Sequence, residues 1–280
     1  VESFATGHAH RRIAYLGEPA RNERGFSRPK EDQLAALAEP YVAHFTLFDS
    51  VPEEDLERTE PAPYPANVVL GYAELLRRLR RGREWNPDIL TEAVQRRIFA
   101  AFERYRVLAT HREGPLGVSG LERALAERVR KHIHGEQGGA GRFWVGRPVL
   151  VTENAYDVRL MNGDVGLILP VRNGTLAVHF PTEHGLRAVA TSRLPPHEGA
   201  LAMTVHKSQG SQFDRIALVL AGRNSPIQTR ELVYTGVTRA KNQLAWLGTR
   251  EELEDALGRT VARTSGLGAL LREPEPAPAS

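Results

Sequence analysis

Three largely apolar runs in the C-terminal half constrain the fold more than any other feature. They cover residues 200–205, 215–220 and 243–247. Uniformly apolar strands are typical of a parallel sheet that is buried on both faces. Helical patterns at residues 229–240 and 250–257 lie between and after these runs. Together the patterns predict an α/β domain built on a parallel sheet.

The first strand of this sheet is expected near residue 107, ahead of a helix at residues 118–133. Residues 142–196 then change in character. Short β-rich segments alternate there with the turn signals Asn162-Gly163 and Asn173-Gly174. Because Asn-Gly between two strands is the strongest short-range signal for a hairpin, this stretch predicts a small antiparallel β-barrel inserted into the α/β domain.

The N-terminal part is less regular. Helical patterns at residues 68–79 and 88–102 form a pair, and the first ends in an arginine run at 77–83. That run is either a solvated helix end or a DNA contact. Within the Pro-rich start only a helix near residues 31–38 is expected. We therefore expect five segments along the chain. Residues 1–65 are irregular, and residues 66–141 contain the helical pair with the first strand and helix of the α/β domain. Residues 142–196 form the barrel, residues 197–272 form the rest of the α/β domain, and residues 273–280 are a disordered tail.

The composition of the chain indicates its cellular environment and its partners. The chain of 280 residues has a formal net charge of +3 and no cysteine. The lack of cysteine excludes disulfides and thiolate metal sites and fits the cytoplasm. No apolar stretch reaches the ~18 residues of a membrane helix, so no membrane partner is expected. The chain starts without methionine, and we expect it to be part of a longer protein. Of its 37 basic residues only four are lysines. This arginine excess suits phosphate binding, but a GC-rich coding sequence, whose codons favour arginine, better explains most of it.

A polar segment follows the first of the apolar runs directly. Thr204, His206, Lys207, Ser208 and Gln209 supply hydroxyl, imidazole, ammonium and amide groups, and Gly210 allows a close backbone approach or a positive φ. Side chains at the carboxyl ends of parallel strands face the ligand crevice. Such donors bind phosphates without reading a base. The alternative is a capped turn whose polar groups only satisfy the backbone.

Arg239 ends the short helical pattern at residues 229–240. A guanidinium at a helix end can reach a nucleotide on a neighbouring domain and act as an arginine finger. The alternative is a surface arginine that pairs with Glu231 or faces solvent.

Two other groups of residues are weaker candidates. Phe143, Trp144, Tyr156 and Arg159 in the predicted barrel suit stacking on single strands, although Trp144 and Tyr156 equally suit sealing the barrel end. The pair His132 and His134 has no third ligand nearby in sequence, so we expect solvated helix-end residues and no metal site.

The two polar blocks resemble motifs V and VI of superfamily 1 helicases, most closely those of the RecD family, which includes the alpha subunit of exodeoxyribonuclease V. The resemblance covers residues 69–271. The segments that carry it are 202–214, 229–240, 263–270, 112–118, 144–149 and 162–166.

This resemblance implies a RecA-like sheet, the P-loop NTPase-type second motor domain, with an inserted SH3-like barrel and N-terminal helices. It also implies ATP-driven 5′ to 3′ movement on DNA. Residues 204–209 and Arg112 would face single-stranded DNA. Gly210, Gln212 and Arg239 would face the nucleotide, and Arg239 would act in catalysis. Gln212 replaces the family's acidic residue that reaches the nucleotide sugar. The family usually carries Asn soon after the Leu of this helix, but here Leu121 is followed by Glu122, which weakens the case for a polar contact there.

No phosphate loop of the form G-x-x-x-x-G-K-[ST] occurs in the sequence. We therefore expect ATP and Mg²⁺ to bind only in the full-length protein, and this chain alone to bind neither and to lack ATPase activity. The implied partners are single-stranded DNA, the missing N-terminal motor domain, and RecB-like and RecC-like subunits. Two alternatives remain open: a non-catalytic module that binds DNA or a subunit, and an RNA helicase fragment.

Overall fold

The computed structural model describes residues 12–21, 27–42, 44–45, 69–81, 84–85, 87–136, 138, 141–222 and 225–260. The expected tail at 273–280, the segment 263–270 and most of the Pro-rich start lie outside the described residues. Within the described part no helix has both the length and the apolar character needed to cross a membrane.

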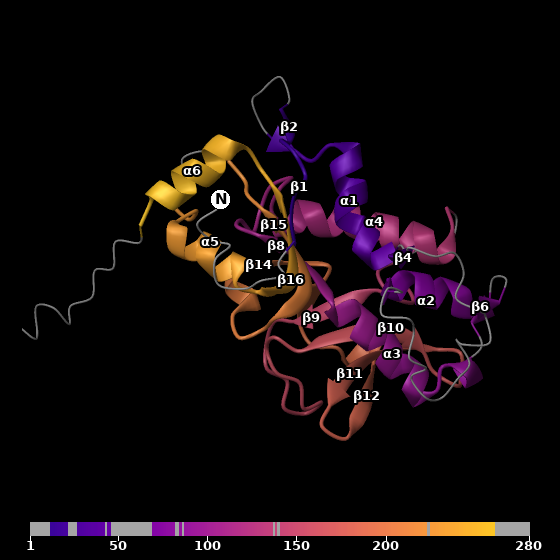
Figure 1. Cartoon of the computed structure of the whole chain (residues 1–280). Coiled ribbons are helices and arrows are strands. Elements are labelled where there is room, and N and C mark those ends of the chain that lie inside the picture. The colour runs from indigo at the N-terminus through magenta and orange to yellow at the C-terminus, as the bar shows by residue number, and fades with distance from the viewer. Residues whose placement is uncertain are drawn as a thin grey trace, which may run out of the picture.

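A five-stranded parallel sheet forms the centre of the chain (Figure 1). Every neighbouring pair in it runs parallel, which confirms the α/β prediction. In spatial order its strands are β1 (Arg12–Tyr15), β16 (Ala240–Leu247), β15 (Phe213–Val219), β8 (Tyr105–Ala109) and β14 (Ala202–Thr204).

Helices cover both faces of this sheet (Figure 1). Strand β8 is buried along its whole length, and its side chains alternate between two cores. Val107 and Ala109 pack with the helices of the N-terminal half, whereas Leu108 packs with the two C-terminal helices. The helices are α1 (Glu31–Val42), α2 (Tyr72–Leu79), α3 (Glu92–Glu103), α4 (Val118–His134), α5 (Arg230–Val237) and α6 (Arg250–Gly258).

Two N-terminal elements join the core although they lie in the segment expected to be irregular. Strand β1 adds to the sheet edge beside β16. Helix α1 extends past the expected residues 31–38, and its Tyr41 is 1% exposed. The sheet therefore does not begin near residue 107. A four-residue edge strand among Pro and Gly residues has too little alternation to be recognised in the sequence.

Residues 148–199 form a second sheet of five antiparallel strands, with its own apolar core (Figure 1). The Asn173-Gly174 turn joins two of them as expected, and Gly174 has a φ of +77°. Among the described residues no pairing joins the edge strands β12 and β13, so closure into the expected barrel is not confirmed. In spatial order the strands are β12 (Gly185–Ala190), β11 (Leu176–Thr182), β10 (Val165–Pro170), β9 (Pro148–Val151) and β13 (His197–Gly199).

Short elements complete the described chain. The two-stranded ribbons are β2 (Ala20–Arg21) with β3 (Ser27–Arg28), β4 (His44–Phe45) with β5 (Val69–Leu70), and β6 (Arg80–Arg81) with β7 (Glu84–Trp85). The 3-10 turns are η3 (Pro87–Ile89), η4 (Thr191–Arg193) and η5 (His206–Ser208).

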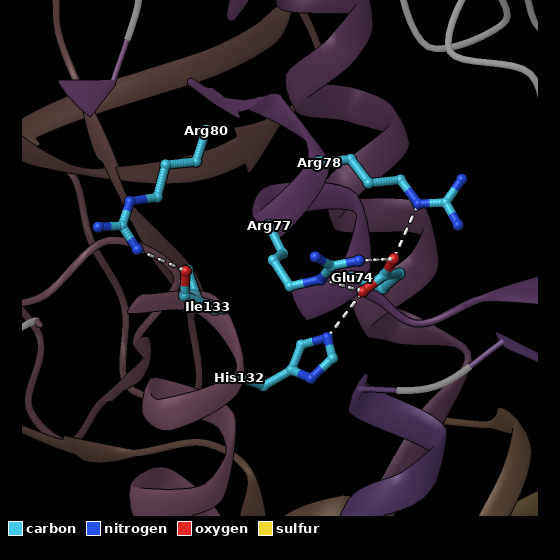
Figure 2. A network of polar contacts seen from close by, with 6 residues as sticks. All are labelled: Glu74, Arg77, Arg78, Arg80, His132 and Ile133. Atoms are coloured by element: carbon cyan, nitrogen blue, oxygen red, sulfur yellow. Dashed lines mark hydrogen bonds and ion pairs between the residues drawn. The ribbon is translucent and has the colours of Figure 1, made fainter. Parts of the chain in front are cut away.

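The arginine run begins in the last turn of α2, and three of its members bond to other groups of the fold (Figure 2). The Glu74 carboxylate, with its side chain 3% exposed, accepts hydrogen bonds from Arg77 at 2.7 Å and from Arg78 at 2.8 Å. His132 on α4 lies 2.8 Å from the same carboxylate, and Arg80 donates to the Ile133 carbonyl at 3.1 Å. These contacts join α2 to α4, and they show that His132 is not the solvated helix-end residue that the sequence predicts.

Neutralising Glu74 tests this clamp. Burial opposes its ionisation, but hydrogen bonds from His132, Arg77 and Arg78 outweigh it and hold the pKa of Glu74 well below its usual range. We expect Glu74→Gln to lower the free energy of unfolding by about 2–4 kcal/mol at pH 7, because three cationic or polar groups lose a buried partner. Urea titrations of both proteins measure the difference.

The pH dependence has a defined sign. A carboxylate whose pKa is lowered by folding stabilises the folded state at pH values above its pKa in the unfolded chain. This contribution to the free energy of unfolding is lost as the pH falls below that pKa. The gap between wild type and Glu74→Gln should therefore shrink from pH 7 to pH 3. Glu92→Gln is the matched control, since Glu92 forms an exposed i,i+4 pair with Arg96 worth less than about 1 kcal/mol. Equal losses in the two variants would contradict the clamp.

Candidate nucleotide and nucleic-acid interface

The polar loop after β14 begins at the carboxyl end of a sheet strand. Pairing continues one residue beyond β14, since Val205 donates to the Ala109 carbonyl at 3.1 Å. The chain then turns through η5, where the Lys207 amide donates to the Thr204 hydroxyl at 3.2 Å. Gly210 ends the turn with a φ of +85°, a left-handed conformation that favours glycine. Of the two uses that the sequence allows for Gly210, the structure shows the positive φ.

Side chains of the loop divide into two groups. Ser208 is fully buried, and its hydroxyl donates to the Val205 carbonyl at 2.7 Å. Ser208 and Thr204 therefore help to fold the loop, as in a capped turn. His206, Lys207 and Gln209 are exposed. The outward face of the loop thus presents imidazole, ammonium and amide groups.

Arg239 connects this loop to the end of α5. Its Nε donates to the Thr235 carbonyl at 3.0 Å, and its Nη2 donates to the Thr238 hydroxyl at 3.2 Å. Its Nη1 donates to the Ser211 carbonyl at 3.1 Å. The Phe213 amide also donates to the Arg239 carbonyl at 2.8 Å. The two polar blocks of the sequence are therefore in direct contact, and Arg239 is half-buried at their junction.

The remaining nucleotide candidates adjoin that junction. Gly210 and Gln212 flank Ser211 in the chain, and both are exposed. An arginine has five N–H donors, and the three contacts of Arg239 use three of them. Two donors are left for an incoming anion, held on a side chain whose position is set by the backbone.

The structure brings Arg112 and Lys207 together on a third residue, Glu198. Arg112 follows β8 and Lys207 follows β14, and these strands are parallel neighbours whose carboxyl ends meet. Arg112 Nη2 lies 3.6 Å from Glu198 Oε2, and Lys207 Nζ lies 2.5 Å from Glu198 Oε1. Sequence reasoning missed Glu198, because only the register of β13 places it beside these cations.

Glu122 corrects an expectation. The sequence weakened the case for a polar contact there, but Glu122 Oε2 accepts hydrogen bonds from the backbone amides of Leu201 and Ala202 at 2.8 and 2.9 Å. Gly199 leaves the space for this side chain, since a Cβ on it would lie 1.8 Å from Glu122 Oε1. That oxygen is itself buried and has no hydrogen-bond partner among the residues that the structure describes. Glu122 thus fixes the start of β14.

Two further side chains bind the same backbone. Arg106 donates to the Ala200 carbonyl at 2.8 Å, and Tyr41 donates to the Leu201 carbonyl at 2.6 Å. The Arg106 guanidinium lies 4.0 Å from the Phe102 ring centroid, and the residue is 2% exposed. Residues 200–202 are therefore held by α1, β8 and α4 at once.

The structure does not bring the weaker candidate residues of the sequence analysis into this site. Trp144 is 5% exposed, whereas Tyr156 is 74% exposed and does not seal the sheet. Arg159, also exposed, has a φ of +52°. His134 is half-buried and its Nε2 lies 2.9 Å from the Val145 carbonyl, so it too differs from the solvated residue expected. Among the described residues no group of three His, Cys, Asp or Glu side chains is arranged to hold a metal ion.

A family model matches the part of the chain that contains this site. Residues 199–246 match the UvrD-like helicase C-terminal domain. That stretch contains β14 with its polar loop, β15, α5 and most of β16. The two polar blocks, which resemble motifs V and VI, thus both lie within the matched stretch.

Particular relatives narrow the class. The chain is 41% identical over 186 residues to the RecBCD enzyme subunit RecD of Haemophilus influenzae, covering 65% of this chain and 27% of that protein. It is 39% identical over 180 residues to RecD of Mycolicibacterium smegmatis, covering 64% and 31%. These matches confirm the resemblance to RecD-type helicases, in the C-terminal helicase portion. The chain spans less than a third of the length of either relative.

More distant similarities were also found. The ATP-dependent RecD2 DNA helicase of Deinococcus radiodurans is 29% identical over 154 residues, covering 55% of this chain and 21% of that protein. A crystal structure of Pif1 helicase from Bacteroides, in complex with ADP-AlF3 and ssDNA, aligns over 76% of this chain and 55% of that chain. Its sequence identity is 15% and its TM-score 0.36.

Neutralising Glu122 tests its role at the start of β14. Burial raises the pKa of Glu122 to about 7, although the Ala202 and Leu201 amides favour the carboxylate. The pKa of Glu122 is higher in the folded protein than the ~4.3 of an unfolded chain. Its protonated form therefore stabilises the fold fully at pH values below ~4.3, and this stabilisation is lost as the pH rises to about 7. Glu122→Gln does not titrate. Between pH 5 and pH 8 its unfolding free energy should therefore rise by about 1–3 kcal/mol relative to wild type.

Urea unfolding at the two pH values measures this shift. Glu127→Gln, at an exposed glutamate of the same helix, is the control and should show no comparable change. A difference between wild type and Glu122→Gln that stays constant with pH would show that the buried carboxyl does not titrate in this range.

Proposed function

We propose that this chain is the C-terminal motor half of an ATP-dependent DNA helicase of the RecD type. In this proposal the five-stranded sheet is a RecA-like second motor domain, and the antiparallel sheet is a small SH3-like insert within it. The full-length protein moves 5′ to 3′ on single-stranded DNA in the cytoplasm. It acts with RecB-like and RecC-like subunits, as part of an exodeoxyribonuclease V that serves recombinational repair.

One observation carries the nucleotide half of the proposal: the Arg239 guanidinium is bound to the backbone of the loop that contains Gly210 and Gln212. An arginine finger must be held in place before the transition state forms, because preorganised charge costs no reorganisation during reaction. ATP and Mg²⁺ would be held by a motor domain carrying the phosphate loop that this sequence lacks. Arg239 would then act across the domain boundary, and Gln212 would bond the nucleotide sugar.

The DNA half of the proposal depends on the exposed side chains His206, Lys207, Gln209 and Arg112. They are cationic or polar and follow two adjacent strands. This combination suits contact with a sugar–phosphate backbone, without reading sequence. Thr204 and Ser208 contribute by shaping the loop, and an approaching phosphate could share the Thr204 hydroxyl.

Replacing Arg239 in the full-length protein tests the arginine finger. We expect Arg239→Ala to lower the DNA-stimulated kcat for ATP hydrolysis by about 10³-fold or more, because charge on the transferring phosphoryl group loses its partner. Arg239→Lys should rescue little, since an ammonium lacks the planar fork. Steady-state phosphate release measures kcat, and binding of a labelled oligonucleotide should stay within about threefold of wild type.

Arg230→Ala is the matched control, because Arg230 is an exposed residue at the start of the same helix. It should retain wild-type turnover. If Arg239→Ala hydrolyses ATP normally, the chain is better described as a non-catalytic module that binds DNA or a partner subunit.

Replacing Lys207 tests the nucleic-acid contact in the chain itself. We expect Lys207→Gln to weaken binding of single-stranded oligothymidylate and to reduce the slope of log K against log salt by about 0.7, the value for one phosphate contact on a single strand. Fluorescence anisotropy over a salt series gives both quantities. Lys131→Gln, at a lysine near the C-terminal end of α4 whose side chain is 39% exposed, should change neither.

An unchanged salt slope in Lys207→Gln would remove Lys207 from the interface. Competition between oligothymidylate and oligouridylate in the same assay separates the proposal from the RNA helicase alternative. The DNA proposal predicts that the RNA competes less well.

A further inference from the structure

Glu198 links the antiparallel insert to the loops of the parallel sheet. It lies in β13, the edge strand that pairs with β9, opposite Leu150. Its side chain is 25% exposed, so it is accessible to solvent while it remains in contact with both loops. The residue thus lies where the chain leaves the insert and returns to the parallel sheet.

Both oxygens of Glu198 are occupied by cations from different loops. Oε1 contacts the Lys207 ammonium at 2.5 Å and Oε2 lies 3.6 Å from the Arg112 guanidinium. One carboxylate therefore bridges two cations that belong to the proposed DNA contact. A backbone phosphate offers the same features, which are two oxygen acceptors and a negative charge between them.

These contacts are of a kind that an incoming anion can displace. The Arg112 side chain is 70% exposed and that of Lys207 is 33% exposed. Ion pairs that are open to solvent contribute little to stability, because water and salt screen them. The carboxylate nevertheless lowers the local positive charge as long as it stays in place.

We propose that Glu198 occupies, in the absence of nucleic acid, the position of a backbone phosphate between Arg112 and Lys207, so that single-stranded DNA binds by displacing it. This inference rests on the proposed DNA-binding function. It assigns Glu198 as a positioning residue that keeps the two cations near each other and competes with the ligand. Because β13 belongs to the insert, DNA at this position also breaks a contact between the insert and the two loops.

The test compares Glu198→Gln with wild type in binding a fluorescein-labelled oligothymidylate. Gln keeps the shape and removes the charge. We expect the Kd at low salt to fall by about 3- to 10-fold. This is the range expected when two exposed ion pairs, which a phosphate would otherwise have to displace, are removed. The slope of log K against log salt should become steeper by up to about 0.7, because in wild type the displaced carboxylate takes up a salt cation that offsets one of those released from the DNA.

Glu183→Gln is the control for net charge, since Glu183 is an exposed glutamate in the turn between β11 and β12. It should leave the Kd within about twofold of wild type. The thermal unfolding curves of both variants should match wild type.

A double-mutant cycle provides the second measurement. In an Arg112→Gln background, the gain in binding free energy that Glu198→Gln produces should shrink to less than half. The reason is that one of the two cations paired with the carboxylate is gone. An undiminished gain would show that Glu198 acts only through net charge.

Failure of the inference and failure of the proposed function give different results. If wild type binds oligothymidylate and Glu198→Gln binds it equally or more weakly, Glu198 does not compete with DNA and the helicase proposal stands. If wild type shows no binding at low salt, both are overturned.

Discussion

The position of the whole site depends on how the backbone of residues 200–202 is held. Tyr41, Arg106 and Glu122 come from three different elements and bind the carbonyl or amide groups of this short stretch. Buried backbone groups must find partners, and here side chains supply them where the insert ends and β14 begins. The register of β14 against β8 follows, and the register decides where the polar loop emerges.

This register brings the candidate residues together in two adjacent groups, one at the proposed DNA contact and one at the proposed nucleotide contact. The ends of β8 and β14 bring Arg112 and Lys207 to the same carboxylate. The loop continues from there to Ser211, whose carbonyl receives the Arg239 guanidinium. Fewer than ten residues of chain therefore connect the proposed DNA contact to the proposed nucleotide contact. In the proposed function, a shift of the loop at the DNA contact would move Ser211 and the Arg239 guanidinium bonded to it, and ATP hydrolysis would be coupled to movement on DNA in this way.

The sequence predicts the parallel sheet, its helices and the polar loop, because strands buried on both faces and polar strand ends leave strong local signals. It does not predict β1 or the part that α1 plays, since a four-residue edge strand and a helix next to Pro-rich segments have weak periodicity. The contact of Glu122 was misjudged, and Glu198 was missed, for a different reason. Each acts on atoms that are far away in sequence, and only the strand register shows which carboxylate meets which backbone amide or cation.

The arginine finger is the central claim, and binding of a transition-state analogue tests it most directly. In the full-length protein, the Kd values for ADP and for ADP with aluminium fluoride should be measured in wild type and Arg239→Ala. The account predicts that the substitution weakens the fluoride complex by about 10²-fold or more and changes ADP binding by less than about threefold, because the guanidinium acts on charge that develops only in the transition state. Equal effects on both ligands, or none on either, would contradict it.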